Sequence, residues 1–171
     1  MPEAPLPVFR ADTTSDPVLV RVDGRATFQN SGCLREFIAR MLAQGKPRLV
    51  LDFAGCEGVD STFLGVLAGA AIEIRRSAPH GSLVIVRAGP RNLELMRNLG
   101  LHRLLTLDSS AGVVGMGNFD TALQVRRQSE AECARLVLEA HENLVAADEA
   151  NRSKFQDLLA ILRERSDQTP G

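Results

Sequence analysis

The first two thirds of the chain alternate between short apolar runs and segments whose apolar residues recur every three to four positions. The runs are rich in Val, Leu and Ile, which is typical of strands buried between helices. They occupy residues 18–22, 49–53, 83–86 and 104–107, and a further strand is expected around residues 8–10. This order predicts an α/β fold with a mixed sheet of four to five strands and flanking helices.

Three helices are expected between these strands. The first carries its apolar residues at helical spacing: Leu34, Phe37, Ile38, Met41 and Leu42. Gly45 stands where a left-handed residue ends such a helix. A loop of small residues, 54–59, precedes the second helix, which opens at residues 60–62. The third helix is expected to start at Pro90, because proline suits the first helical position.

The last third of the chain has a different character. It contains no Gly or Pro from residue 119 to residue 169, and apolar residues recur at helical spacing over 119–146 and 155–162. A polar break at 147–151 predicts a helical hairpin or one long kinked helix. The chain therefore divides into an N-terminal tail (1–7), an α/β domain (8–108), a Gly-rich connector (109–118), a helical extension (119–166) and a C-terminal tail (167–171).

The composition excludes several classes of function but does not identify the function. The 171 residues carry 20 Lys and Arg against 21 Asp and Glu, so the electrostatic case for nucleic-acid binding is weak. The chain has no Trp or Tyr, and no run approaches the roughly 20 apolar residues of a membrane-spanning helix. The three cysteines are widely spaced and form no metal motif. We expect a cytoplasmic protein without metal, cofactor, nucleic-acid partner or membrane insertion.

The triplet Asp60-Ser61-Thr62 is the most informative chemical feature. It follows a buried strand and opens an apolar helix, so a plain N-cap is one interpretation. A serine at a helix start is also expected to be exposed and backed by unpaired N–H groups. Because helix N-termini favour negative charge, a phosphate there should leave the domain folded. Ser61 is therefore either part of a cap or a modification site.

Residues 8–108 resemble the STAS domains, whose best-studied members are bacterial anti-sigma-factor antagonists. Asp23-Gly24 after the first long strand, the strand 48–53 ending near an aspartate, and the segment 59–67 around Ser61 carry the resemblance. The strand 83–86, the helix from Pro90 and Leu99-Gly100-Leu101 match the end of the family's pattern. The order and spacing of these pieces are more specific than any one of them.

The resemblance implies a non-catalytic binding module. Such domains bind an anti-sigma factor of the GHKL serine-kinase class, which phosphorylates the serine after the aspartate and thereby abolishes the complex; a phosphatase restores it. Carried over by position, Ser61 is the phosphoacceptor, with Thr62 second. The expected partner-binding residues are Asp23, Asp52, Asp60, Ser61, Thr62, Phe63 and Leu64. Phe63 replaces the family's usual glycine and is expected to project onto the binding face.

Three alternatives stay open at this level. A small serine hydrolase would use Ser61 as nucleophile, His80 or His102 as base, and Asp52 or Asp60 to orient that base. A STAS-like accessory subunit would instead bind the ATPase of an ABC transporter. The helical extension could form a homo-oligomer, cover the sheet, dock a signalling partner, or pack on its own domain.

Overall fold

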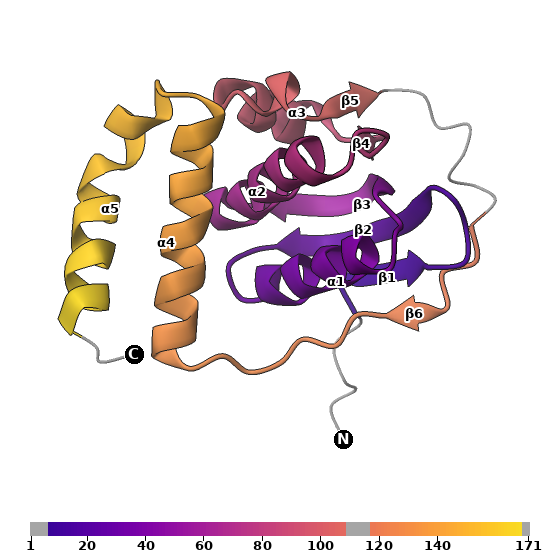
Figure 1. The fold of residues 1–171 in the computed structure, drawn as a ribbon, viewed down its shortest axis with the longest axis horizontal. Helices are drawn as coiled ribbons and strands as arrows, with labels where there is room; N and C mark the ends of the chain where they lie inside the picture. The colour runs from indigo at the N-terminus through magenta and orange to yellow at the C-terminus, as the bar shows by residue number, and fades with distance from the viewer. Residues whose placement is uncertain (1–6, 109–116, 169–171) are drawn as a thin grey trace.

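A six-stranded sheet forms the centre of the molecule in the computed structural model, which describes residues 7–108 and 117–168 (Figure 1). The expected N-terminal tail, connector and C-terminal tail lie largely outside these residues. The strand order is β5-β4-β3-β2-β1-β6. Strands β2 to β5 pair in parallel, whereas β1 pairs antiparallel with β2 and β6. The strands are β1 (Phe9–Asp12), β2 (Val18–Ala26), β3 (Arg48–Val59), β4 (Ser82–Val86), β5 (Thr106–Asp108) and β6 (Thr121–Ala122).

The first three helices connect the parallel strands, as the apolar pattern predicts. They are α1 (Ser31–Ala43), α2 (Ser61–Ser77) and α3 (Pro90–Asn98), and a short 3₁₀ turn, η1 (Leu101–Arg103), follows α3. Helices α1 and α2 lie together on one face of the sheet (Figure 1). Alternate strand residues such as Val20, Leu51 and Ile85 face them and form the main core. Pro90 begins α3, and Gly45 after α1 has a φ of 76°, both as expected.

Strand β3 is longer than the apolar run predicts. Residues 54–59 were expected to form a loop, but they continue β3 and pair with the second half of β2. The pairing contains two register shifts, which accommodate this irregular stretch. At Gly55 a Cβ would lie 2.0 Å from the Asp23 carboxylate, so a larger residue here would require the Asp23 side chain to move. Small residues here mark close strand packing.

The segment after the connector also differs from its prediction. A helix was expected from residue 119, but residues 121–122 form β6 and give the sheet a sixth strand. Leu123 is buried and its N–H donates to the Phe9 carbonyl at 3.0 Å, which holds this segment against the sheet edge. Helix α4 (Glu130–Ala147) starts only where Ser129 accepts from the Glu132 N–H. The expected boundary of the helical extension at residue 119 is therefore wrong.

Two helices form the C-terminal hairpin, which we define as α4 and α5 (Asn151–Gln168). The sequence left open a hairpin or one kinked helix, and the structure has the hairpin. Figure 1 shows α4 standing across the end of the core at which α2 begins, with α5 on its outer side. At Gly65 of α2 a Cβ would lie 2.2 Å from the carbonyl oxygen of Ala140 on α4. The helices thus pack almost backbone to backbone, and the extension packs on its own domain.

The turn between α4 and α5 is tied to the end of α3. The Asn151 amide donates to the carbonyls of Leu99 at 2.9 Å and Leu144 at 2.7 Å, and it is fully buried. The Lys154 ammonium donates to the Asn98 carbonyl at 2.8 Å. These contacts position the hairpin over one end of the α/β domain. Within the described ranges, none of the helices is long and apolar enough to cross a membrane.

Candidate functional site at the start of helix α2

Asp60 caps α2 and ties it to the end of β2. One carboxylate oxygen accepts from the Phe63 N–H at 2.8 Å, and the other accepts from the Phe28 N–H at 2.7 Å. The Asp60 N–H in turn donates to the Ala26 carbonyl at 3.1 Å. The expected cap is therefore present, with Asp60 as the capping residue. This fixes the position of Ser61, the first residue of the helix.

The Ser61 hydroxyl contacts a histidine from the C-terminal hairpin. Its Oγ lies 2.8 Å from Nε2 of His141, and Nδ1 of His141 lies 2.6 Å from the Val137 carbonyl oxygen. A carbonyl only accepts, so Nδ1 carries the proton, and in the neutral ring Nε2 accepts from the Ser61 hydroxyl. Ser61 is half-buried as a result, and the expectation of an exposed serine is wrong. Helix α4 supplies the partner that shields it.

His141 itself is almost completely enclosed. Its exposed fraction is 1%, and its ring meets the Phe155 ring edge-on with 4.8 Å between centroids. Sequence reasoning missed this residue, which lies 80 positions from Ser61. The available signal was its place one helical turn after Val137, beside the apolar residues of α4 that face α2.

A pocket opens beside Ser61 between the start of α2, α3 and α5. Its volume is about 340 Å³, and Leu64, Leu95, Leu99 and Phe155 make its lining mainly apolar. Lys154 lines it as well, although its ammonium is bound to the Asn98 carbonyl.

Two apolar side chains are exposed near this end of the helix. Leu95, in the wall of the pocket, is 37% exposed, and Phe28, whose N–H binds Asp60, is 42% exposed. Exposed apolar residues grouped beside a polar site are typical of a protein-binding surface.

The three residues after Ser61 point into the molecule. Thr62 and Leu64 are buried, and Phe63 has an exposed fraction of 0%. The Phe63 ring lies between those of Phe9 and Phe53, with centroid distances of 6.1 and 6.0 Å. The expectation that Phe63 projects onto the binding face is wrong, because its ring fills the core. Burial likewise separates Thr62 from solvent, so Ser61 is the better-placed hydroxyl of the pair.

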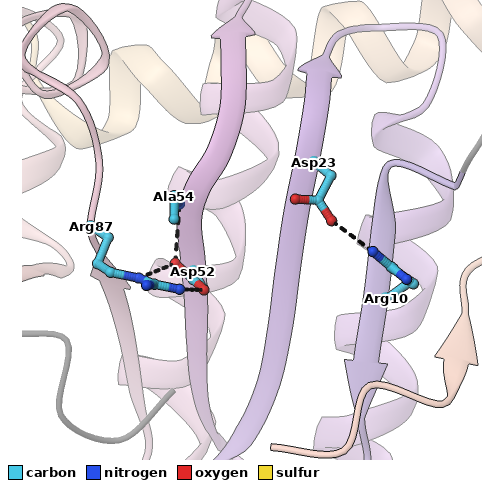
Figure 2. A network of polar contacts seen from close by, with 5 residues as sticks. All are labelled: Arg10, Asp23, Asp52, Ala54 and Arg87. Atoms are coloured by element: carbon cyan, nitrogen blue, oxygen red, sulfur yellow. Dashed lines mark hydrogen bonds and ion pairs between the residues drawn. The ribbon is translucent and has the colours of Figure 1, made fainter. Parts of the chain in front are cut away.

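Asp23 and Asp52 lie on the other face of the sheet, away from α2. Figure 2 shows them on neighbouring strands, each paired with an arginine. Asp52 is buried and accepts from the Ala54 N–H at 3.0 Å, from Nε of Arg87 at 2.9 Å and from a second nitrogen of that guanidinium. Asp23 accepts from Arg10 at 3.2 Å. The hydrogen bond to Asp52 raises the pKa of Arg87 above its usual value. The two carboxylates therefore do not join the Ser61 site.

The residues of the hydrolase alternative are not brought together. His80 and His102 are exposed, and the hydroxyl of Ser61 pairs with His141 instead. Behind His141 stands a peptide carbonyl rather than a carboxylate. Asp60 is occupied in capping, and Asp52 lies on the opposite face of the sheet. A Ser–His pair is present, but its third member is not the acidic group that such a triad uses.

Cys33 and Cys56 behave as structural residues. Burial, with a smaller contribution from Glu36, raises the pKa of the Cys33 thiol to about 11, and burial also raises the pKa of Cys56. Such thiols are poor nucleophiles because little thiolate forms near neutral pH. Among the described residues, no group of three or more His, Cys, Asp or Glu side chains could hold a metal ion.

Comparison with known proteins identifies the family. The family model described as "Mlab, STAS domain" matches residues 9–106, more than half of the chain. The chain belongs to the STAS domain family. A search of curated proteins gives no match. The six-stranded α/β domain with its flanking helices is therefore a STAS fold, as the sequence resemblance implies.

Solved structures share this fold at low sequence identity. The anti-sigma factor antagonist SpoIIAA in its unphosphorylated form aligns with a TM-score of 0.51 and 17% identity, covering 60% of this chain and 89% of SpoIIAA. A putative anti-sigma factor antagonist from Thermotoga maritima, TM1081, aligns with a TM-score of 0.54 and 18% identity, covering 60% of this chain and 86% of its own. Both have the STAS fold.

Proposed function

We propose that this STAS domain is a regulatory module whose protein partner binds at the start of α2 and is controlled by phosphorylation of Ser61. The observation that carries the proposal is the position of Ser61 as the first residue of α2, directly after the capping Asp60. Ser61 is also the residue that the family resemblance implies as the phosphoacceptor. The partner-binding role of Asp23 and Asp52 has no comparable support, because both are paired on the other face of the sheet.

The physical chemistry of a helix start suits such a switch. A phosphoserine carries about −1.5 to −2 charges near neutral pH, and the unpaired N–H groups of a helix N-terminus favour negative charge there. Phosphorylation therefore leaves α2 intact. Its cost falls on a complex in which a partner covers Ser61, because the phosphate must then lose water and approach the partner beside the like charge of Asp60.

The proposed binding surface combines this polar centre with apolar neighbours. Phe28, whose N–H binds Asp60, and Leu95, in the pocket wall beside Ser61, both expose apolar area. The partner class that the family resemblance suggests is an anti-sigma factor with GHKL-type serine-kinase activity, opposed by a phosphatase. We place this cycle of phosphorylation and dephosphorylation in the cytoplasm. An accessory subunit bound to an ABC-transporter ATPase would use the same fold, and the identity of the captured protein separates the two.

The test uses the full-length protein, tagged and expressed in its own host. Wild type and three variants are compared by the amount of partner that each retains, measured by quantitative mass spectrometry. Wild type and Ser61→Ala are expected to retain the same partner, whereas Ser61→Asp retains at least tenfold less. Ser153→Asp is the matched control, because Ser153 is an exposed serine in the first turn of α5. Retention of the partner by Ser61→Asp at the level of Ser153→Asp contradicts the proposal.

A further inference from the structure

No group fits between the Ser61 hydroxyl and the His141 ring as they are placed in the structure. The two polar atoms lie 2.8 Å apart, which is the length of one hydrogen bond. The imidazole cannot move easily, because it is 1% exposed and packs against the Phe155 ring with 4.8 Å between centroids. The backbone of α4 beside His141 lies close to α2 as well, since a Cβ added at Gly65 would lie only 2.2 Å from the Ala140 carbonyl oxygen.

Phosphorylation also removes the donor of this hydrogen bond. The unmodified hydroxyl donates its proton to Nε2, while Nδ1 donates to the Val137 carbonyl. A phosphate ester has no proton on Oγ, so two acceptors would face each other across the same short distance. The hydrogen bond that links α2 to the enclosed histidine of α4 is thereby lost.

The charges around Ser61 offer the phosphate little compensation in this position. Asp60 adds a like charge from the preceding residue, and both of its oxygens are already hydrogen-bonded. The adjacent pocket is lined mainly by apolar side chains, which offer a phosphate few hydrogen bonds in place of the water it would lose there. Lys154 is the cation at this pocket, and its ammonium is held by the Asn98 carbonyl.

We propose that a phosphate on Ser61 and the docked position of α4 exclude each other, so that phosphorylation releases the C-terminal hairpin from α2. The inference rests on the phosphorylation proposed above and adds what the modification does to the molecule itself. In the unmodified state, α4 covers the face of α2 that contains Ser61, Gly65 and Gly69. Release exposes this face together with the apolar residues of α4 that pack on it, Leu136 and Ala140.

Hydrogen exchange of the full-length protein tests the proposal directly. Protein with phosphoserine encoded at position 61, and Ser61→Asp, are compared with Ser61→Ala, which loses the same hydrogen bond without gaining charge. The measurement is made near pH 8, at which free imidazole is neutral. Amides of α4 are expected to exchange at least tenfold faster in the charged variants than in Ser61→Ala. Amides of β3 and β4 are expected to keep their protection.

Two controls keep the experiment decisive. Ala140→Leu should force α4 from α2 without any charge, whereas Ala146→Leu, on the exposed side of α4, should leave exchange unchanged. Suppose that Ala140→Leu accelerates exchange of α4 but the phosphoserine protein is protected as well as Ser61→Ala, or better. Either result overturns the proposal. Better protection would mean that His141 and Lys154 bind the phosphate. Loss of protection throughout β3 and β4 overturns it too, because Ser61 then supports the whole fold.

These outcomes are separate from those of the partner experiment. A hairpin that stays docked while Ser61→Asp loses its partner overturns the release and leaves the proposed function standing. A released hairpin with an unchanged partner supports the release and contradicts control of partner binding by Ser61.

Discussion

The hydroxyl of Ser61 on α2 and the imidazole of His141 on α4 share a hydrogen bond of 2.8 Å across 80 positions of sequence. The contact joins the STAS domain to a helical hairpin that lies outside the residues matched by the family model. The proposed phosphoacceptor is thus also a packing residue of the C-terminal hairpin.

Replacing His141 should weaken the molecule measurably. His141→Ala removes a buried ring from between Ser61 and Phe155 and leaves a cavity, so we expect a loss of about 2–4 kcal/mol in the free energy of unfolding. Chemical denaturation followed by circular dichroism is suitable, because the chain has no Trp or Tyr for fluorescence. His102→Ala, at an exposed position, is the control and should change stability by less than about 0.5 kcal/mol. Equal effects of the two substitutions contradict this role of His141.

The packing of α2 on α4 predicts an inverted effect at Gly65. In an exposed helix, Gly→Ala is stabilising by about 1 kcal/mol. In Gly65→Ala the new Cβ would lie 2.2 Å from the Ala140 carbonyl oxygen, so we expect a loss of about 1–3 kcal/mol instead.

Gly58→Ala is the comparison for this prediction, because nothing lies within 4 Å of its added Cβ. It should be close to neutral in the same denaturation experiment. A stabilised Gly65→Ala protein would mean that α4 does not sit against α2 in solution.

The ion pair between the buried Asp52 and the partly exposed Arg87 should be sensitive to loss of its arginine. Arg87→Ala leaves Asp52 buried with one fewer charged partner, and we expect destabilisation of about 2–3 kcal/mol. Arg10→Ala breaks the neighbouring pair with Asp23, in which both side chains are substantially exposed, and should cost no more than about 1 kcal/mol. Similar losses of stability in both variants would show that the effect of removing the arginine does not depend on the burial of Asp52.

Asp12 makes part of the stability depend on pH. Its carboxylate accepts from the N–H groups of Asn118 and Thr14 and from the Thr14 hydroxyl, and the Asn118 hydrogen bond contributes most to lowering the pKa below 3.8. Because the folded state lowers this pKa, the stabilisation is complete above the unfolded value and is lost as pH falls through the folded one. Asp12→Asn should therefore lower Tm by several degrees at pH 7.

The difference between Asp12→Asn and wild type should shrink as pH falls below about 3.8. Asp157→Asn, on the exposed surface of α5, should match wild type throughout. A difference for Asp12→Asn that is constant from pH 7 to acid conditions would show that the ionised carboxylate is not what binds Asn118.

Local sequence patterns predicted most of the strands and helices, because these depend mainly on residues close together in the chain. The apolar runs 18–22, 49–53 and 83–86 became buried strands because α1 and α2 cover them, and the capping chemistry placed Asp60 and Ser61 at a helix start. The run 104–107 gave only the short, mostly exposed β5 at Thr106–Asp108. Strand β6 has two residues and therefore no periodicity to detect. The helix start at Glu130 did have a signal, since Ser129 and Glu132 form a capping-box pattern that the longer apolar spacing obscured.

The errors at the site have a common physical origin in contacts between distant segments. Phe63 was placed on the surface because its burial depends on Phe9 and Phe53, which come from two different strands. The shielding of Ser61 depends on a histidine from α4, which belongs to the hairpin that the family pattern does not include. Helical periodicity predicted a hairpin or one long kinked helix, but not which face of the domain it covers.

The most direct measurement of the central claim is the phosphorylation state of position 61 in the protein's own host. Intact mass and peptide mapping would be applied to the wild-type protein and Ser61→Ala, purified with and without a phosphatase inhibitor across growth phases. The account predicts a phosphorylated fraction with the phosphate on Ser61, a larger fraction with the inhibitor, and none in Ser61→Ala. A protein that stays unmodified at Ser61 under all these conditions, or is phosphorylated at another residue, would contradict it.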